Sequence, residues 1–150
     1  MTKLGSDRVV VIDTNIVLDL LVFDDSGARG LKSGLARGQW TWIATRPMRE
    51  EFERVLSYPQ ILPRLGSCGL RAGEVLAGFD RQALLVESPA KAMLTCSDAD
   101  DQKFIDLAIQ HRCMLLSRDG AVLSMARRLA QLGVTALTAI PDSSYRLIDP

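Results

Sequence analysis

The chain has 150 residues, 47% of them hydrophobic, which fits a single globular domain over residues 1–150 and is too short for two independent cores. Its 18 basic and 18 acidic side chains balance, which excludes a general nucleic-acid binder that relies on positive charge over the whole molecule. Three cysteines without a paired spacing argue against a disulfide framework and favour a reducing compartment, so we expect a cytoplasmic protein.

Short apolar segments alternate with longer segments of helical pattern along the chain. The intervening segments are long enough to cross from one strand to a parallel neighbour. This alternation predicts an α/β fold in three layers, with a parallel sheet between helices. The expected strands span residues 9–12, 41–44, 83–86, 113–117 and 134–138.

Helices are expected over residues 14–22, 26–37, 47–57, 70–78, 98–112 and 120–132. Three glycines weaken the second of these helices, and residues 58–70, which include two prolines, could form helical turns or a loop. The apolar run over residues 9–22 is interrupted by Asp13 and Asp19 and is too short to cross a bilayer. We therefore expect no membrane partner.

Two aspartates directly follow predicted strands. Asp13 ends the apolar run VVVI, and Asp119 comes after the run MLL in CMLLSRDG. In open parallel sheets, ligands bind outside the carboxyl ends of the strands, which is where both carboxylates would emerge. If the two strands are neighbours, Asp13 and Asp119 approach each other and their repulsion needs a counter-charge.

The helix expected over residues 98–112 adds a third acid. Its apolar stripe includes Phe104 and Ile105, and at 100° per residue Asp101 projects into the middle of that stripe. By the same geometry, Asp100 and Asp106 are expected to be solvated. Asp98 is a candidate N-cap, with Ser97 as its competitor, because either side chain can accept from the free amides of the first turn.

The helix in RPMREEFERVL offers a fourth acid. Its apolar stripe includes Met48 and Phe52; Glu51 lies closest to that face, whereas Glu50 points almost opposite. Helix geometry leaves two interpretations of Glu51 open. It could face the site, or it could be an exposed acid favoured by the helix dipole and by pairing with a nearby arginine.

These four acids could converge at the carboxyl edge of the sheet. Four carboxylates within a few ångströms cannot all stay ionised unless they share protons or hold a cation. Ligands that offer only oxygen suit Mg²⁺ or Mn²⁺, which can activate water and stabilise charge on a phosphodiester. Each aspartate taken singly could instead be a cap or turn residue.

Four stretches together resemble a PIN domain: VVVIDTNIVLDLL, REEFERVL, CSDADDQKFIDLA and LLSRDGAVL. The chain is similar to bacterial PIN proteins classed as toxin components of toxin-antitoxin systems, related to VapC-like toxins. The resemblance implies a five-stranded parallel sheet in the order 3-2-1-4-5 and Mg²⁺- or Mn²⁺-dependent hydrolysis of an RNA substrate. It also implies a cytoplasmic antitoxin partner that blocks the site, and it suggests a homodimer.

The resemblance assigns roles to particular residues. The acids of the family's site fall on Asp13, Glu51, Asp101 and Asp119, and the three aspartates among them would be metal ligands. The supporting residues would be Thr14 or Asn15 beside the first acid, Asp98 before the third, and Ser117 at the end of the fourth strand.

One loop departs from the family pattern. Many relatives place Gly-Asp after the fourth strand and a further acid two residues on, whereas here Asp119 follows Arg118 and the later position is Ala121. The metal site survives this change, but the occupancy of a second metal is put in doubt. Arg118 could contact a substrate phosphate or be an ordinary surface arginine.

Other classes fit less well. A receiver-type signalling domain needs an acidic pair after the first strand, where Asp13 stands alone. A flap nuclease needs extra helical segments to clamp a strand, and His111 with Cys113 offers too few ligands for zinc. The main alternative is a catalytically inactive PIN-like module that binds RNA or a protein.

Overall fold

The computed structural model describes residues 8–140. Its centre is a five-stranded parallel sheet in the order β3-β2-β1-β4-β5, which confirms the predicted α/β class and strand order. The observed strands agree with the expected ones to within one residue at each end. They are β1 (Val9–Ile12), β2 (Thr41–Ala44), β3 (Ala83–Leu85), β4 (Met114–Leu116) and β5 (Thr135–Leu137).

Strand β1 is the centre of the sheet and is buried on both faces. Its four residues are all apolar and all buried. Val11 pairs with Ile43 of β2 on one side and with Leu115 of β4 on the other. A continuous apolar run, without polar alternation, is what a strand needs when helices cover both of its faces.

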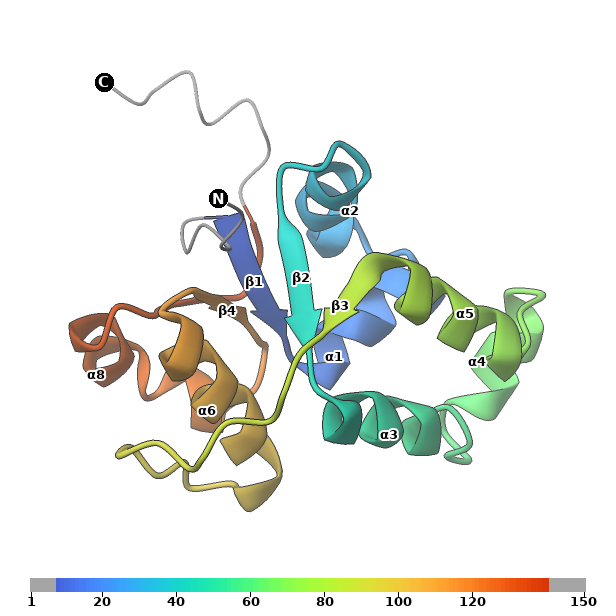
Figure 1. Cartoon of the computed structure of the whole chain (residues 1–150). Coiled ribbons are helices and arrows are strands. Elements are labelled where there is room, and N and C mark those ends of the chain that lie inside the picture. Colours follow the sequence, from blue (N-terminus) through green and yellow to red (C-terminus); the bar gives the residue numbers. More distant parts are fainter. Residues whose placement is uncertain (1–7, 141–150) are drawn as a thin grey trace.

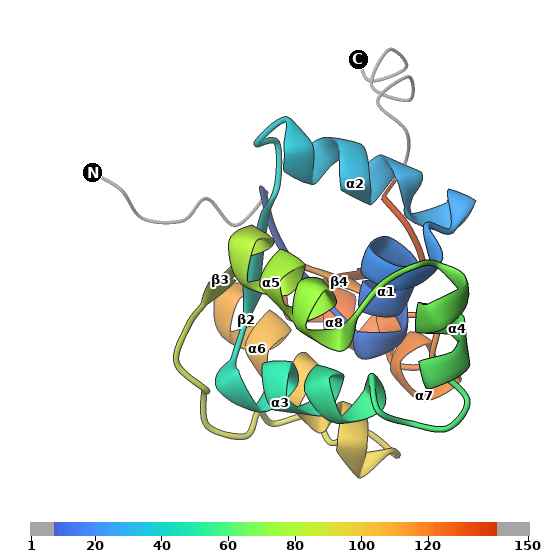
Figure 2. The same cartoon turned by 90° about the vertical axis from the view of Figure 1, so that its right-hand side faces the viewer.

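Helices cover both faces of the sheet (Figures 1 and 2). α1 (Thr14–Leu18) and α5 (Ala72–Gln82) lie on one face, and α6 (Gln102–His111) and α8 (Ala126–Gln131) lie on the other. α3 (Arg46–Val55) lies beyond the ends to which β1 and β2 point. Across residues 8–140, no helix combines the length and apolarity that crossing a membrane requires.

The helices expected over residues 26–37 and 98–112 each begin with a short 3-10 helix, and three others differ more from the structure. The first is an α-helix only to Leu18, then continues as a π-helix that ends at Asp24 in a left-handed conformation (φ 49°). The last is divided at Ser124, where Met125 donates to the carbonyl of Val122 in a tighter turn. The remaining helical segments are η2 (Asp19–Phe23), η3 (Ser26–Ala28), α2 (Arg29–Ala36), α4 (Leu62–Ser67), η4 (Ala99–Asp101) and α7 (Gly120–Leu123).

The third difference is α5, which was expected to end at Gly78 and instead runs to Gln82. The cause is the buried ring of Phe79, which packs edge-on against Trp42 (centroids 4.8 Å apart) and stacks on Phe52 (5.6 Å). These contacts join β2, α3 and α5, and aromatic packing of this kind outweighs the helix-breaking tendency of one glycine.

The irregular chain between β3 and η4 is held against α6 by two side chains. Gln102 accepts from the amide of Cys96 (2.7 Å) and donates to the carbonyl of Leu94 (2.9 Å). Asp106 accepts from the amide of Ala92 (2.9 Å) and from Gln102 (2.8 Å). The expectation that Asp106 is solvated was therefore wrong, because this segment folds back over the polar face of α6.

Candidate metal centre

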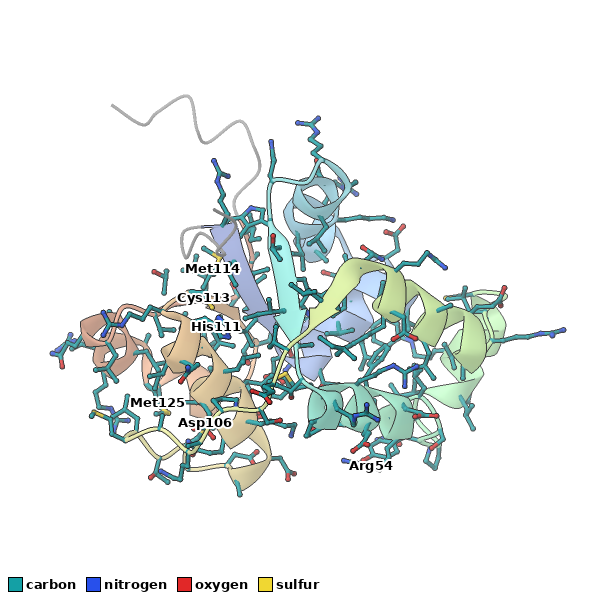
Figure 3. The ribbon with its side chains drawn as sticks, viewed as in Figure 1. Arg54, Asp106, His111, Cys113, Met114 and Met125 are labelled. Carbon is teal, nitrogen blue, oxygen red and sulfur yellow. The ribbon has the colours of Figure 1, made fainter. Side chains whose placement is uncertain are left out.

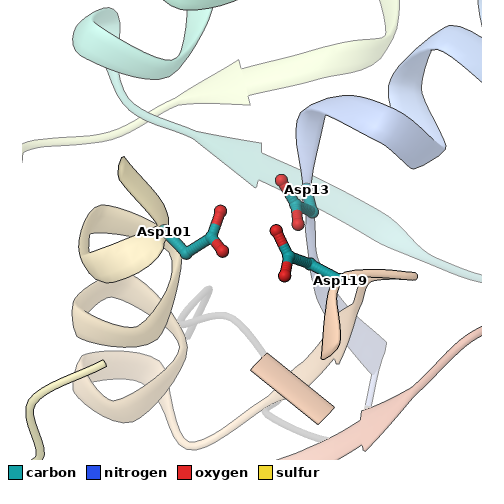
Figure 4. A group of neighbouring side chains, drawn as sticks. All are labelled: Asp13, Asp101 and Asp119. Atoms are coloured by element: carbon teal, nitrogen blue, oxygen red, sulfur yellow. The ribbon is translucent and has the colours of Figure 1, made fainter. Parts of the chain in front are cut away.

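Three aspartates from distant parts of the chain meet at the carboxyl edge of the sheet. Asp13 follows β1, Asp119 follows β4, and Asp101 ends η4 just before α6. One carboxylate oxygen of each lies within 4.8 Å of the others, and the side chains point toward one another (Figure 4). We call this group the Asp cluster. Within residues 8–140, no other three acidic, histidine or cysteine side chains lie close enough to share a metal ion.

Pairing of β1 with β4 brings Asp13 close to Asp119, and Ser117 joins them. The Ser117 hydroxyl donates to one oxygen of Asp13 (2.5 Å) and accepts from the backbone amide of Asp119 (2.9 Å). Ser117 is fully buried, so this link is shielded from water. Ser117 thus joins the Asp13 side chain to the Asp119 backbone, and its role in supporting a metal site stays a prediction.

Both strand-end aspartates also begin helices. Asp13 accepts from the amide of Thr14 (2.7 Å) at the start of α1, and Asp119 accepts from the amide of Ala121 (2.9 Å) at the start of α7. Each of these bonds uses one lone pair of one oxygen, and a carboxylate has about four. Capping and ligation were treated as alternatives from the sequence, but the geometry allows both.

Asp101 carries the clearest electrostatic signature of the site. The residue is 6% exposed, and its Oδ2 atom is buried without a hydrogen-bond partner among the described residues. Burial, interaction with the Asp119 carboxylate and the negative charge of Asp13 raise the pKa of Asp101 from 3.8 to about 8. Burial also raises the pKa of Asp13, although its hydrogen bonds from Ser117 and Thr14 act in the opposite direction.

These properties fit a divalent cation. A buried carboxylate oxygen without a donor is costly, and clustered negative charges repel one another. A cation between the three side chains would satisfy the unpaired oxygen of Asp101 and favour the ionised form of every ligand. Since all donor atoms are oxygen, the chemistry suits Mg²⁺ or Mn²⁺ rather than zinc.

Glu51 lies beside the Asp cluster but is held by other partners. One of its oxygens accepts from the Thr14 hydroxyl (2.5 Å), and the other is ion-paired with the ammonium of Lys103. Its charge is close enough to contribute to the raised pKa of Asp13. Glu51 therefore faces the site, which is the first of the two interpretations that helix geometry left open. It also bridges the segments that carry Asp13 and Asp101.

Two residues with predicted supporting roles, Asp98 and Asn15, bond to the chain around the Asp cluster and not to its carboxylates. Asp98 is the N-cap of η4 and accepts from the amide of Asp100 (2.9 Å), so its expected capping role is confirmed over that of Ser97. Its negative charge adds to the raised pKa of Asp101. Asn15 accepts from the amide of Arg118 (3.3 Å) and so holds the turn after β4 rather than the Asp cluster itself.

The family model for the PIN domain matches residues 9–121, the segment that contains every member of the Asp cluster. The chain belongs to the PIN domain family. No curated protein sequence matches this PIN domain significantly.

A solved structure agrees with this fold. A chain from the crystal structure of VapBC2 from Rickettsia felis, bound to a DNA fragment from their promoter, matches with a TM-score of 0.58 and 13% sequence identity. The match covers 85% of this chain and 98% of that chain. At this low identity the likeness supports the fold and its strand order.

Arg118 in this PIN domain is paired with an acid that the sequence analysis did not single out. Its guanidinium forms a two-point ion pair with Asp19 (2.9 and 3.1 Å), whose side chain is only 10% exposed. Arg118 is therefore an exposed arginine that is anchored on a buried carboxylate, and its contact with a substrate phosphate stays a prediction. Asp19 was missed as its partner, although an acid inside the apolar run IVLDLLV was a visible signal.

His111 and Cys113 lie near Met114, the first residue of β4 (Figure 3), and neither belongs to the Asp cluster. Burial lowers the pKa of His111 and raises the pKa of the Cys113 thiol to about 12. Two side chains are too few for a zinc site, and within residues 8–140 no third potential ligand lies close enough to join them.

Proposed function

We propose that this PIN domain is a metal-dependent endoribonuclease that hydrolyses RNA phosphodiester bonds. The observation that carries the proposal is the Asp cluster, in which the buried Oδ2 atom of Asp101 has no hydrogen-bond partner among residues 8–140. Asp13, Asp101 and Asp119 would hold one Mg²⁺ or Mn²⁺ ion. When bound, such an ion activates water for attack and stabilises negative charge that develops on a phosphate.

The other residues of the site hold these ligands in place. Ser117 and the amide of Thr14 fix the orientation of the Asp13 carboxylate through two hydrogen bonds. Glu51 bridges the Thr14 hydroxyl and Lys103, and so ties α1 and α6 to α3. Ligands that are oriented before the metal arrives lose little freedom on binding it, which favours affinity and rate.

We further propose that the activity is that of a toxin in a type II toxin-antitoxin system, acting in the cytoplasm. Support comes from the PIN family assignment and from the similarity in fold to a chain of VapBC2. A cognate antitoxin would cover the Asp cluster and keep the nuclease inactive. A homodimer remains part of this proposal, and size-exclusion chromatography with light scattering would test it.

The activity can be tested with purified protein and single-stranded RNA. Cleavage should require Mn²⁺ or Mg²⁺ and stop with EDTA. Asp13→Asn and Asp101→Asn should each lower the rate by roughly a hundredfold or more, because several kcal/mol of charge stabilisation depend on the ion. Glu50→Gln, which removes one exposed acid from α3, is the matched control and should cleave normally.

Two outcomes would contradict the proposal. Undiminished cleavage by both aspartate variants would mean a contaminating nuclease or another site. Binding of RNA without any turnover, equally strong in Mn²⁺ and in EDTA, would instead indicate the inactive binding module.

A further inference from the structure

Lys103 places a positive charge beside the Asp cluster. It is the second residue of α6, two positions after Asp101, and its ammonium is ion-paired with Glu51. The ammonium also donates to the backbone carbonyl of Asp100 (2.6 Å), and its side chain is 26% exposed. The lysine is therefore fixed in position but still reachable from solvent.

The ion pair with Lys103 occupies Glu51, the remaining carboxylate that lies beside the Asp cluster. Both oxygens of Glu51 already have partners, namely the Thr14 hydroxyl and the Lys103 ammonium. A metal ion at Glu51 would have to displace the ammonium, because two cations would otherwise compete for the same oxygen. Repulsion between the ion and the displaced lysine would add to the cost of binding.

Other ligands for a second ion are scarce around Asp119. Position 121 is alanine and offers no side-chain oxygen. The side-chain oxygen of Asn15 accepts from Arg118, and Asp98 is an exposed cap bonded to the start of η4. Mg²⁺ and Mn²⁺ need several oxygen ligands, so these side chains do not complete a second metal site.

We propose, on the basis of the nuclease activity inferred above, that the Lys103 ammonium is the second cation of the site. It takes, beside Glu51, the place that a second divalent ion would hold. The site therefore holds one divalent ion in the Asp cluster and one fixed lysine.

The lysine also has a role toward substrate. An ammonium has three N–H donors, and Lys103 uses two of them toward Glu51 and the Asp100 carbonyl. The third has no hydrogen-bond partner among residues 8–140, where the ring of Phe104 lies 5.1 Å from the ammonium. That donor is available to a phosphate oxygen of the RNA backbone. Lys103 is thus assigned as a catalytic residue that contacts the phosphate under attack and neutralises part of its charge.

Metal stoichiometry tests this assignment without any RNA. Isothermal titration of the full chain with Mn²⁺ should show one binding site. Lys103→Met, which keeps an unbranched side chain up to the ε position but removes the ammonium, should gain a second and weaker site through the freed Glu51. The double variant Lys103→Met with Glu51→Gln should return to one site. Lys32→Met, the same substitution in an exposed ion pair on α2, is the matched control and should behave like the parent protein.

Cleavage rates give a second readout. At a Mn²⁺ concentration that fills one site, Lys103→Met should lose about a hundredfold in kcat, as is typical when one preorganised charge is removed. Raising Mn²⁺ further should restore much of the rate, because a second ion can replace the ammonium. Lys103→Arg should keep one metal site. Unchanged thermal unfolding midpoints would show that the variants are folded.

The outcomes separate this inference from the proposed function. Two Mn²⁺ sites in the parent protein, or a single unchanged site in Lys103→Met, would overturn the role of Lys103 and leave the nuclease proposal intact. A parent protein that neither binds Mn²⁺ nor cleaves RNA would overturn both.

Discussion

Replacing Asp101 with asparagine should make the metal-free protein more stable, and increasingly so as the pH rises. Folding raises the pKa of Asp101 from 3.8 to about 8 because the carboxylate is buried among other acids. Between these two values, the unfolded chain releases a proton that the folded protein retains. The contribution of Asp101 to the free energy of unfolding therefore falls with increasing pH in that range and levels off above about pH 8.

The size of the effect follows from the same pKa values. One proton retained by the folded state corresponds to roughly 1.4 kcal/mol per pH unit. From pH 5 to pH 8, the stability gap between the asparagine variant and the parent should widen by about 4 kcal/mol. The raised pKa of Asp13 has the same sign and would make the parent protein's own pH dependence steeper.

Urea unfolding followed by circular dichroism, in EDTA at several pH values between 5 and 8, would measure this gap. In a parallel series, Mn²⁺ at one hundred times its dissociation constant should raise the free energy of unfolding of the parent by about 2.7 kcal/mol. The same Mn²⁺ concentration should stabilise the variant much less. A gap that stays constant with pH would refute the reasoning, since it would mean that Asp101 is already ionised in the folded protein at pH 5.

Three further predictions concern the supports of the site. Ser117→Ala should lower the free energy of unfolding by about 2 kcal/mol in urea unfolding, because Oδ2 of Asp13 and the Asp119 amide each lose their hydrogen-bond partner. Equal stability would contradict the buried link. Arg118→Met should lower the free energy of unfolding by about 1–2 kcal/mol. The loss is smaller than for a fully buried ion pair because the arginine is half-exposed. Adding Asp19→Asn should recover part of that loss, and strictly additive losses would mean that the two residues do not interact. Gln102→Ala should speed proteolysis within residues 87–98, as followed by mass spectrometry, because two of its hydrogen bonds hold that segment; an unchanged cleavage rate would show that other contacts hold it.

The strands were the most predictable part of the fold. Each is short, mostly apolar and bounded by polar or turn residues, and the central strand β1, which is buried on both faces, is the easiest to recognise. Helix ends were less predictable because distant contacts decide them. Phe79 extends α5 through its packing on Phe52 and Trp42, neither of which is a neighbour in sequence.

The site shows the same division. Asp13 and Asp119 could be placed at the carboxyl edge because they follow strands, and Asp101 could be turned inward because of its position in an apolar stripe. The partners of Glu51 and Arg118 could not be foreseen. Glu51 pairs with Lys103, and Arg118 pairs with Asp19, and in both pairs the partner is distant in the sequence. Sequence periodicity carries no information on which of these distant charged side chains meet.

The order of residues along this chain by itself determined a parallel α/β sheet with acids at its carboxyl edge, because local hydrophobic patterns dictate which segments become strands and where they end. Only the tertiary structure decided which charges neutralise one another. In this structure one oxygen of Asp101 has no hydrogen-bond partner among residues 8–140, and Glu51 forms an ion pair with Lys103. The reason is physical: electrostatic pairing depends on distances through space, and these exist only once the segments have packed.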